Sequence, residues 1–172
     1  MNLIDLKIES NRLVQKTIDF HYAEDIFKEF NANITKYMGP KTAGNIDETR
    51  SFITHAIECL KNGTELHMII TKKDNNEFIG CVGLHGIGNT DPELGIWIKE
   101  KAHGNGYGLE AITAMIKWAR ANIKFDHLKY PVDKRNWASR KIAEKNNGKI
   151  IKEFKSINQS NFELDEIEYW IY

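Results

Sequence analysis

Apolar and polar residues recur with two different periods along the chain, and the change of period separates predicted helices from predicted strands. Apolar residues return every three or four positions over residues 23–34, 52–60 and 109–123, as in helices that bury one face. The second of these helices is predicted to begin at an Asp47 N-cap and to end at Asn62-Gly63. Its predicted buried stripe consists of Phe52, Ala56, Ile57 and Leu60.

Shorter segments between turn-forming residues have the composition of strands. The connections within residues 66–99 are too short for crossovers, so these strands are predicted to form an antiparallel meander. A further helix is predicted over residues 137–146, and the predicted strands are residues 12–18, 66–71, 78–84, 93–99, 128–132, 148–157 and 162–172. This order predicts an α+β fold in one domain, residues 1–172, with a mixed, mostly antiparallel central sheet and helices on both faces.

Composition narrows the function classes. Lys plus Arg and Asp plus Glu both number 24, so the chain lacks the basic excess of a nucleic-acid-binding protein. No apolar run is long enough for a membrane span or a signal peptide, which favours a cytoplasmic protein. Cys59 and Cys81 lack the spacing of a thiol metal site or a disulfide framework, and we expect two buried free thiols and no metal.

The strongest chemical signal is the glycine-rich segment His103-Gly104-Asn105-Gly106-Tyr107-Gly108, between a predicted strand and the most regular predicted helix. Glycines allow positive φ and let a ligand approach the backbone closely. The free N–H groups at a helix start attract anions, and the helix dipole adds to that attraction. The segment therefore predicts a binding site for a phosphate or pyrophosphate.

Two common phosphate-binding motifs do not match this segment. A dinucleotide fingerprint starting at Gly104 requires glycine where Leu109 stands, and the Gly-Lys pair of a Walker loop is missing. The short turns before the loop also differ from the crossovers of a Rossmann unit. A nucleotide-binding oxidoreductase is therefore disfavoured.

The remaining pattern resembles the GNAT family of N-acetyltransferases. Their acetyl-CoA loop has Arg or Gln, two residues, Gly, one residue and then Gly or Ala, and this chain has His103, Gly106 and Gly108 at those positions. Residues 136–146 resemble the Asn-x-x-Ser-x-x-x-x-Glu-Lys-Asn helix of the RimJ/RimL-like branch, which includes acetyltransferases of ribosomal-protein N-termini. The resemblance extends from Arg12 to the C-terminus.

The resemblance implies a set of acetyl-CoA contacts. The backbone of Ile96, Trp97 and Ile98 would pair with the pantetheine amides as an added strand. Residues 103–108, that is His103, Gly104, Asn105, Gly106, Tyr107 and Gly108, would hold the pyrophosphate, with Asn136 on the pantetheine arm and Arg140 at the phosphates. Because His103 replaces the usual Arg or Gln, backbone amides would carry more of the binding.

Acetyl transfer to an amine also requires a base and a proton for the departing thiolate. Glu93 is the first candidate base and His85 the second, because an imidazole titrates near neutral pH. Many GNAT enzymes have a tyrosine where Ala143 stands, so Ser139 is the candidate acid, although a thiolate leaves readily without one. The acceptor is expected near Tyr37, Met38, His85 and Trp97.

These residues predict an enzyme that moves acetyl from acetyl-CoA to a primary amine by direct attack in a ternary complex. The acceptor is either a protein N-terminal α-amine or a small-molecule amine. The alternative is a non-catalytic acyl-CoA-binding or sensory module, suggested by His103 and Ala143. The apolar C-terminal segment 169–172 is compatible with a monomer or a homodimer.

Overall fold

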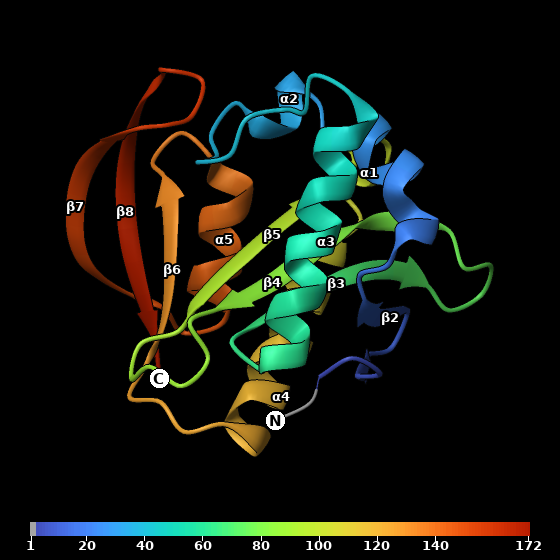
Figure 1. The fold of residues 1–172 in the computed structure, drawn as a ribbon. Helices are drawn as coiled ribbons and strands as arrows, with labels where there is room; N and C mark the ends of the chain where they lie inside the picture. The colour runs from blue at the N-terminus through green and yellow to red at the C-terminus, as the bar shows by residue number, and fades with distance from the viewer. Residues whose placement is uncertain (1–2) are drawn as a thin grey trace.

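Eight strands form one sheet in the computed structural model, which describes residues 3–172 (Figure 1). The strand order is β1-β2-β3-β4-β5-β6-β8-β7, and neighbouring strands are antiparallel except for β5 and β6. The strands are β1 Lys7–Glu9, β2 Leu13–Thr17, β3 Glu65–Lys72, β4 Phe78–His85, β5 Glu93–Ile98, β6 Leu128–Asp133, β7 Lys149–Ile157 and β8 Glu163–Ile171. The predicted mixed, mostly antiparallel α+β architecture is confirmed.

Helices cover both faces of this sheet, with α3 in front and α4 behind in Figure 1. The helices are α1 Ala23–Glu29, α2 Ala32–Thr35, α3 Ile46–Asn62, α4 Tyr107–Asn122 and α5 Trp137–Lys145. The short 3-10 helices are η1 Phe20–Tyr22 and η2 Glu100–Ala102. None of the helices within residues 3–172 has the length and apolar character needed to cross a membrane.

The core lies on both sides of the central strands. Ile53 of α3 is buried on one side and Ile112 of α4 on the other, both at 0% exposure. Ile69 and Ile70 of β3 point to opposite faces and are also fully buried, which explains the nearly continuous apolar run of this strand. The two helices therefore fix the central strands from both faces.

Four features of the fold differ from the sequence prediction. The short strand β1 was not predicted. The helix predicted over residues 23–34 is interrupted, because the Asn31 side chain accepts hydrogen bonds from the backbone N–H groups of Asn33 and Ile34 and starts α2. Asn45, not Asp47, caps α3 in the same way. Phe52 is 42% exposed, and its neighbour Ile53 faces the core instead.

Strands β5 and β6 separate from one another soon after they meet. Within the described residues their pairing is confined to Glu93 and Lys129, whereas β5 pairs with β4 along its whole length. The two strands then diverge, as Figure 1 shows. The edge of β5 that faces β6 is consequently free of a partner strand after Glu93, and this opening positions the candidate active site.

Candidate active site

A cavity of about 680 Å³ lies between α4, α5 and the open edge of β5. It contains most of the residues assigned to acetyl-CoA from the sequence, so the structure brings β5, the glycine loop and α5 together around one space. Within the assigned set, its walls include Ile96, Trp97, Ile98, His103, Gly104, Gly106, Tyr107, Gly108 and Asn136. We call it the donor cavity.

The glycine loop has the conformation that its sequence suggests. Gly104 and Gly106 have φ values of 78° and 76°, in the left-handed region that favours glycine. Gly106 is the N-cap of α4 and has no side chain to satisfy the first-turn N–H groups. Gly108 lies so close to α5 that a Cβ there would stand 2.9 Å from Ile142 Cδ1. The start of α4 therefore faces the cavity with free donors and fits an anionic group.

Side chains brace the loop from behind. Arg12, just before β2, donates from Nη1 to the Asn105 carbonyl at 3.0 Å, stacks over Tyr107 at 4.6 Å, and pairs with Glu110 at 2.7 Å. His103 Nε2 donates to the Ile98 carbonyl at 2.6 Å, so this ring nitrogen is turned toward the backbone. The contact of His103 with the pyrophosphate stays a prediction.

Asn105 and Arg140 do not line the donor cavity. The Asn105 amide donates to two carbonyls of its own loop. Arg140 donates to Tyr169 Oη at 3.3 Å and to the Lys134 carbonyl at 3.2 Å, and its guanidinium lies over Trp137. Its phosphate contact is therefore not supported by the side-chain position seen here.

Two lysines that the sequence analysis did not single out line the donor cavity. Lys141 and Lys145 lie four residues apart on α5, so one helix face presents both ammonium groups. Their i, i+4 spacing was available in the sequence as a signal for this basic wall. Cationic side chains there suit an anionic ligand.

A second cavity of about 640 Å³ lies on the opposite side of β5, under the loop that follows α2. We call it the acceptor cavity. The loop is tied to the β7–β8 turn, because Asn158 Nδ2 donates to the Met38 carbonyl at 3.0 Å and the Gln159 N–H donates to the Gly39 carbonyl at 2.9 Å. The lysine, histidine and carboxylate side chains in the walls of the cavity are Lys41, Glu48, His67, His85, Glu93 and Glu166. With neutral histidines, carboxylates outnumber the ammonium group and the cavity is acidic.

The two cavities meet at a shared set of residues. The shared lining residues are Tyr37, Met38, Ile96, Trp97, Asn136 and Ser139. Trp97 is held there by Phe30 at 5.0 Å and Phe78 at 5.7 Å between ring centroids. Asn136 caps α5 by accepting from the Ser139 N–H at 3.2 Å, which fixes both residues at the junction. A donor and an acceptor molecule can therefore approach one another at this point.

A tyrosine hydroxyl supports Ser139 at the junction. Tyr130 Oη lies 2.7 Å from Ser139 Oγ, and burial raises the pKa of the Tyr130 hydroxyl to about 12. Tyr130 was not predicted, because its alternation with Leu128 and Val132 in β6 is that of an ordinary core position. The pair gives the site two linked hydroxyl groups.

Glu93 lies at the wall of the acceptor cavity, where β5 and β6 are paired. Burial raises the pKa of the Glu93 carboxyl above its ordinary value, and His85 and Lys129 oppose that rise. A carboxylate with a raised pKa is a better proton acceptor than an exposed one. The sequence-based choice of Glu93 thus coincides with a perturbed group in a cavity.

His85 is oriented by a carboxylate on the neighbouring strand. Glu65 accepts from His67 Nε2 at 2.8 Å and from His85 Nδ1 at 2.9 Å through the same oxygen. Burial raises the pKa of Glu65, but these hydrogen bonds outweigh it and the pKa is lowered. A Cβ on Gly83 would lie only 2.8 Å from His85 Nε2, so this glycine makes room for the ring, whereas a Cβ on Gly95 would be in ordinary contact at 3.4 Å. With Nδ1 protonated, Nε2 is the free acceptor.

Comparisons with known proteins agree with this geometry. The sequence matches the family described as the acetyltransferase (GNAT) domain over residues 12–149, and the chain belongs to this family of acetyltransferases. A comparison with curated proteins found no match.

Similar solved structures share the fold at low identity. A GNAT-family acetyltransferase from Bacillus anthracis has a TM-score of 0.83 at 21% identity, covering 96% of this chain and 98% of that one. An acetyl transferase from Salmonella typhimurium that modifies the N-terminal serine of ribosomal protein L7/L12 has a TM-score of 0.81 at 17% identity. The match covers 96% of this chain and 97% of that one. RimJ from Mycobacterium smegmatis in complex with CoA-disulfide has a TM-score of 0.86 at 11% identity. The match covers 96% of this chain and 87% of that one. At these identities the neighbours show that this chain shares their fold.

Proposed function

We propose that this chain transfers the acetyl group of acetyl-CoA to a primary amine by direct attack within a ternary complex. The observation that carries the proposal is the junction of two cavities with opposite electrostatic character. The donor cavity has Lys141 and Lys145 in its walls, and the acceptor cavity has Glu93 and Glu166. An anionic thioester donor and a cationic amine each match one of them.

The donor cavity fits CoA through features of the backbone. The first-turn N–H groups of α4 would bind the pyrophosphate, and Lys141 and Lys145 would add charge for the phosphates. The free edge of β5 at residues 96–98 offers backbone groups to the pantetheine amides, and Asn136 lies beside that path. A β5 N–H directed at the thioester oxygen would stabilise the charge that develops there.

The amine must lose a proton before it attacks, and Glu93 is the group proposed to accept it, directly or through water. Its raised pKa brings it closer to that of an amine. His85 is the second candidate, because Glu65 holds its Nδ1–H and leaves Nε2 as an acceptor on the cavity wall. Near Tyr37, Met38 and Trp97 the acceptor would meet largely apolar walls.

The thiolate of CoA leaves when the bond between carbonyl carbon and sulfur breaks, and it then takes up a proton. Ser139 lies where both cavities meet and is the proposed donor. Tyr130 Oη, 2.7 Å away, is placed to return a proton to Ser139. A thiol has an ordinary pKa of about 8.5, so this assistance is worth less than the removal of the proton from the amine.

An N-terminal α-amine is the first acceptor to test. An α-amine titrates near 8 and a lysine amine near 10.4, so the α-amine is more often neutral at physiological pH. The Salmonella typhimurium neighbour modifies an N-terminal serine, which supports the same class here. Small-molecule amines remain the second class within this proposal.

The test is a panel assay with purified protein and acetyl-CoA. N-terminal peptides, polyamines and aminoglycosides are supplied in turn, CoA release is followed with a thiol reagent, and acetylated products are identified by mass spectrometry. We expect turnover with at least one amine and stoichiometric formation of CoA and acetyl-amine. If the protein binds CoA in calorimetry but acetylates nothing on the panel, the chain is a non-catalytic acyl-CoA-binding module and the proposal is wrong.

A further inference from the structure

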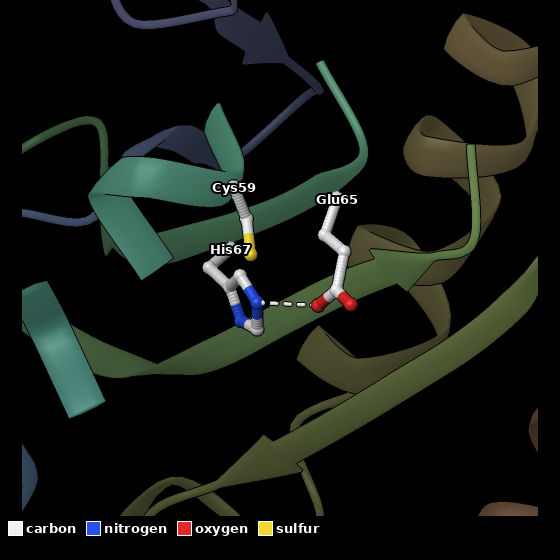
Figure 2. Close-up of side chains that lie close together, drawn as sticks. All are labelled: Cys59, Glu65 and His67. Carbon is white, nitrogen blue, oxygen red and sulfur yellow. Dashed lines mark hydrogen bonds and ion pairs between the residues drawn. The ribbon is translucent and has the colours of Figure 1, made fainter. Parts of the chain in front are cut away.

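A group of metal-ligating side chains lies where α3 ends and β3 begins, and the acetyl-transfer proposal does not use Cys59. Figure 2 shows the sulfur of Cys59 directed toward His67, which is hydrogen-bonded to Glu65. One ligand atom from each of these three residues lies within 4.8 Å of the other two. His55 Nε2 lies 3.6 Å from Cys59 Sγ and adds a fourth donor at the edge of the group.

Local structure explains why these residues gather. His55 and Cys59 are four residues apart on α3 and therefore share one helix face. Gly63, with a φ of 70°, ends α3 in a left-handed C-cap and turns the chain directly into β3. Glu65 and His67 are two residues apart on that strand and share one face of it. Cys59 thus lies beside Glu65 and His67 across a tight connection between rigid elements, with His55 next to Cys59 on the helix.

The donor chemistry is that of a zinc-type ion. Thiolate and imidazole are the ligands that Zn²⁺ prefers in proteins, and a carboxylate oxygen is its usual third type. We propose that Cys59, Glu65 and His67 bind a divalent transition metal of the zinc type and that His55 completes a four-ligand site. This proposal departs from the sequence-based expectation of a protein with no metal and no thiol ligand.

Two of the distances between proposed ligand atoms are close to those of a zinc site. In a tetrahedral zinc site a sulfur and a nitrogen ligand are roughly 3.6 Å apart, and a nitrogen and an oxygen ligand roughly 3.4 Å. The Cys59 Sγ to His55 Nε2 distance is already 3.6 Å. The His67 Nε2 to Glu65 Oε2 hydrogen bond, at 2.8 Å, must open by a few tenths of an ångström so that both atoms contact the ion instead of each other.

Binding also requires protons to move. The Cys59 thiol loses its proton to solvent and becomes a thiolate ligand. The neutral His67 ring exchanges its Nε2 proton for one on Nδ1, so that the Nε2 lone pair faces the ion and the ring charge does not change. Glu65 contributes a carboxylate oxygen. One proton is released for each ion bound.

The surroundings suit a site that is closed on one side and open on the other. Cys59 is 8% exposed, which protects the thiolate, whereas His55 lies on the exposed face of α3 and leaves a route for the ion. His85 Nδ1 holds the Glu65 carboxylate at 2.9 Å, as an outer partner orients a metal-bound carboxylate. Phe52 packs edge-on against the His67 ring at 5.4 Å.

The experiment titrates purified protein with Co²⁺ and Zn²⁺ in the absence of acetyl-CoA, so its outcome is independent of the acetyl-transfer proposal. Bound Co²⁺ should show a thiolate-to-cobalt charge-transfer band in the near ultraviolet, and Zn²⁺ should displace it. Calorimetry in buffers of different ionisation enthalpy should report one proton released per ion.

Three variants assign the ligands. Cys59→Ser should abolish the band, and His67→Gln should weaken Co²⁺ binding by more than about tenfold. Cys81→Ser is the matched control, because it removes the other free thiol and should leave the titration unchanged. Circular dichroism verifies that each variant is folded. The proposal is overturned if wild-type protein binds neither ion, if Co²⁺ binds without the thiolate band, or if folded Cys59→Ser binds like the wild type.

Discussion

The donor and acceptor cavities are similar in size but are built in different ways. The donor cavity takes its main features from one continuous stretch, residues 96–108, in which backbone N–H groups and glycines provide the shape. The acceptor cavity is made of side chains that come from the loop after α2, from α3, β3 and β4, and from β6 and β8. A backbone site leaves a motif in the sequence, whereas a site of scattered side chains does not.

The charges of the two cavities are opposite, as are the charges of the ligands proposed for them. Lys141 and Lys145 make the donor side basic, and Glu48, Glu93 and Glu166 make the acceptor side acidic. Because the whole chain has no net charge, this separation is invisible in the composition. It predicts that substitutions on one side change the kinetics of one substrate and leave the affinity for the other intact.

The largest expected effect comes from Glu93 on the acceptor side. Glu93→Gln removes the proposed proton acceptor while keeping the size of the side chain, so we expect kcat to fall by about 100-fold or more. The KM for acetyl-CoA should change little, because Glu93 lines the acceptor cavity and not the donor cavity. Steady-state kinetics with both substrates varied measures the two effects separately.

The pH profile sharpens this prediction. Only the ionised carboxylate accepts a proton, so kcat/KM should fall as the pH falls through the Glu93 pKa, which burial raises above the ordinary glutamate value. Glu93→Gln should lose this acid limb. Asp91→Asn is a suitable control, because Asp91 lies at the same turn, pairs with Lys129 at 3.0 Å and lines neither cavity. If Glu93→Gln and Asp91→Asn lost the acid limb of kcat/KM equally, the limb would depend on the turn and not on the Glu93 carboxylate.

A smaller effect is expected from the donor loop. Gly106→Val places a β-branched residue at a φ of 76°, and a left-handed conformation costs such a residue about 1 to 3 kcal/mol. We expect the Kd for acetyl-CoA, measured by calorimetry, to rise about tenfold. Gly106→Asn should lose less affinity for acetyl-CoA, because asparagine tolerates this conformation. Equal losses for both variants would show that space, and not backbone conformation, limits binding.

The two hydroxyls at the junction should contribute less than either of these positions. Ser139→Ala should lower kcat by less than about tenfold, because a thiolate with a pKa near 8.5 leaves without much help. Tyr130→Phe should have a similar effect, and the double variant should be no worse than the stronger single one, since the two groups act through one 2.7 Å hydrogen bond. Single-turnover rates measure this; additive losses would mean that the two hydroxyls act independently.

Most residues that the sequence analysis assigned to acetyl-CoA line one cavity, because most of them belong to one contiguous motif. The periodicity of residues 109–123 located α4, and the glycines at 104, 106 and 108 predicted an anion site at its start. The loop after β5 was assigned without knowledge of the sheet order. The divergence of β5 and β6, which exposes the backbone edge, was expected from the family resemblance and not from the residues themselves.

The acceptor side was predicted less completely, for a physical reason. Glu65, His67 and His85 come together through β3–β4 pairing, and the position of the His85 ring depends on the missing side chain of Gly83. Such contacts depend on strand register, which residue spacing does not encode. Cys59 was judged alone in the sequence because its partners follow a helix cap that reverses the chain direction.

The smallest predicted effect concerns the support of β5 at the edge of the donor side. Glu77 accepts hydrogen bonds from Lys72 and Lys99, which lower the Glu77 pKa to about 2. A carboxyl group whose pKa is lowered in the folded protein stabilises the fold at pH values above the ordinary glutamate pKa. This contribution disappears as the pH falls toward about 2. Because the Glu77 side chain is 40% exposed, solvent screening should limit the contribution to less than about 1 kcal/mol.

Urea unfolding of wild type and Glu77→Gln at a series of pH values measures this contribution. The difference in the free energy of unfolding should be constant near neutral pH, shrink below the ordinary glutamate pKa, and vanish near pH 2. Glu163→Gln is the control, because Glu163 pairs with Lys155 in the outer hairpin, away from both cavities. The affinity for acetyl-CoA should be unchanged in both variants. A loss of affinity in Glu77→Gln alone would show that the donor side depends on side chains beyond its contiguous motif.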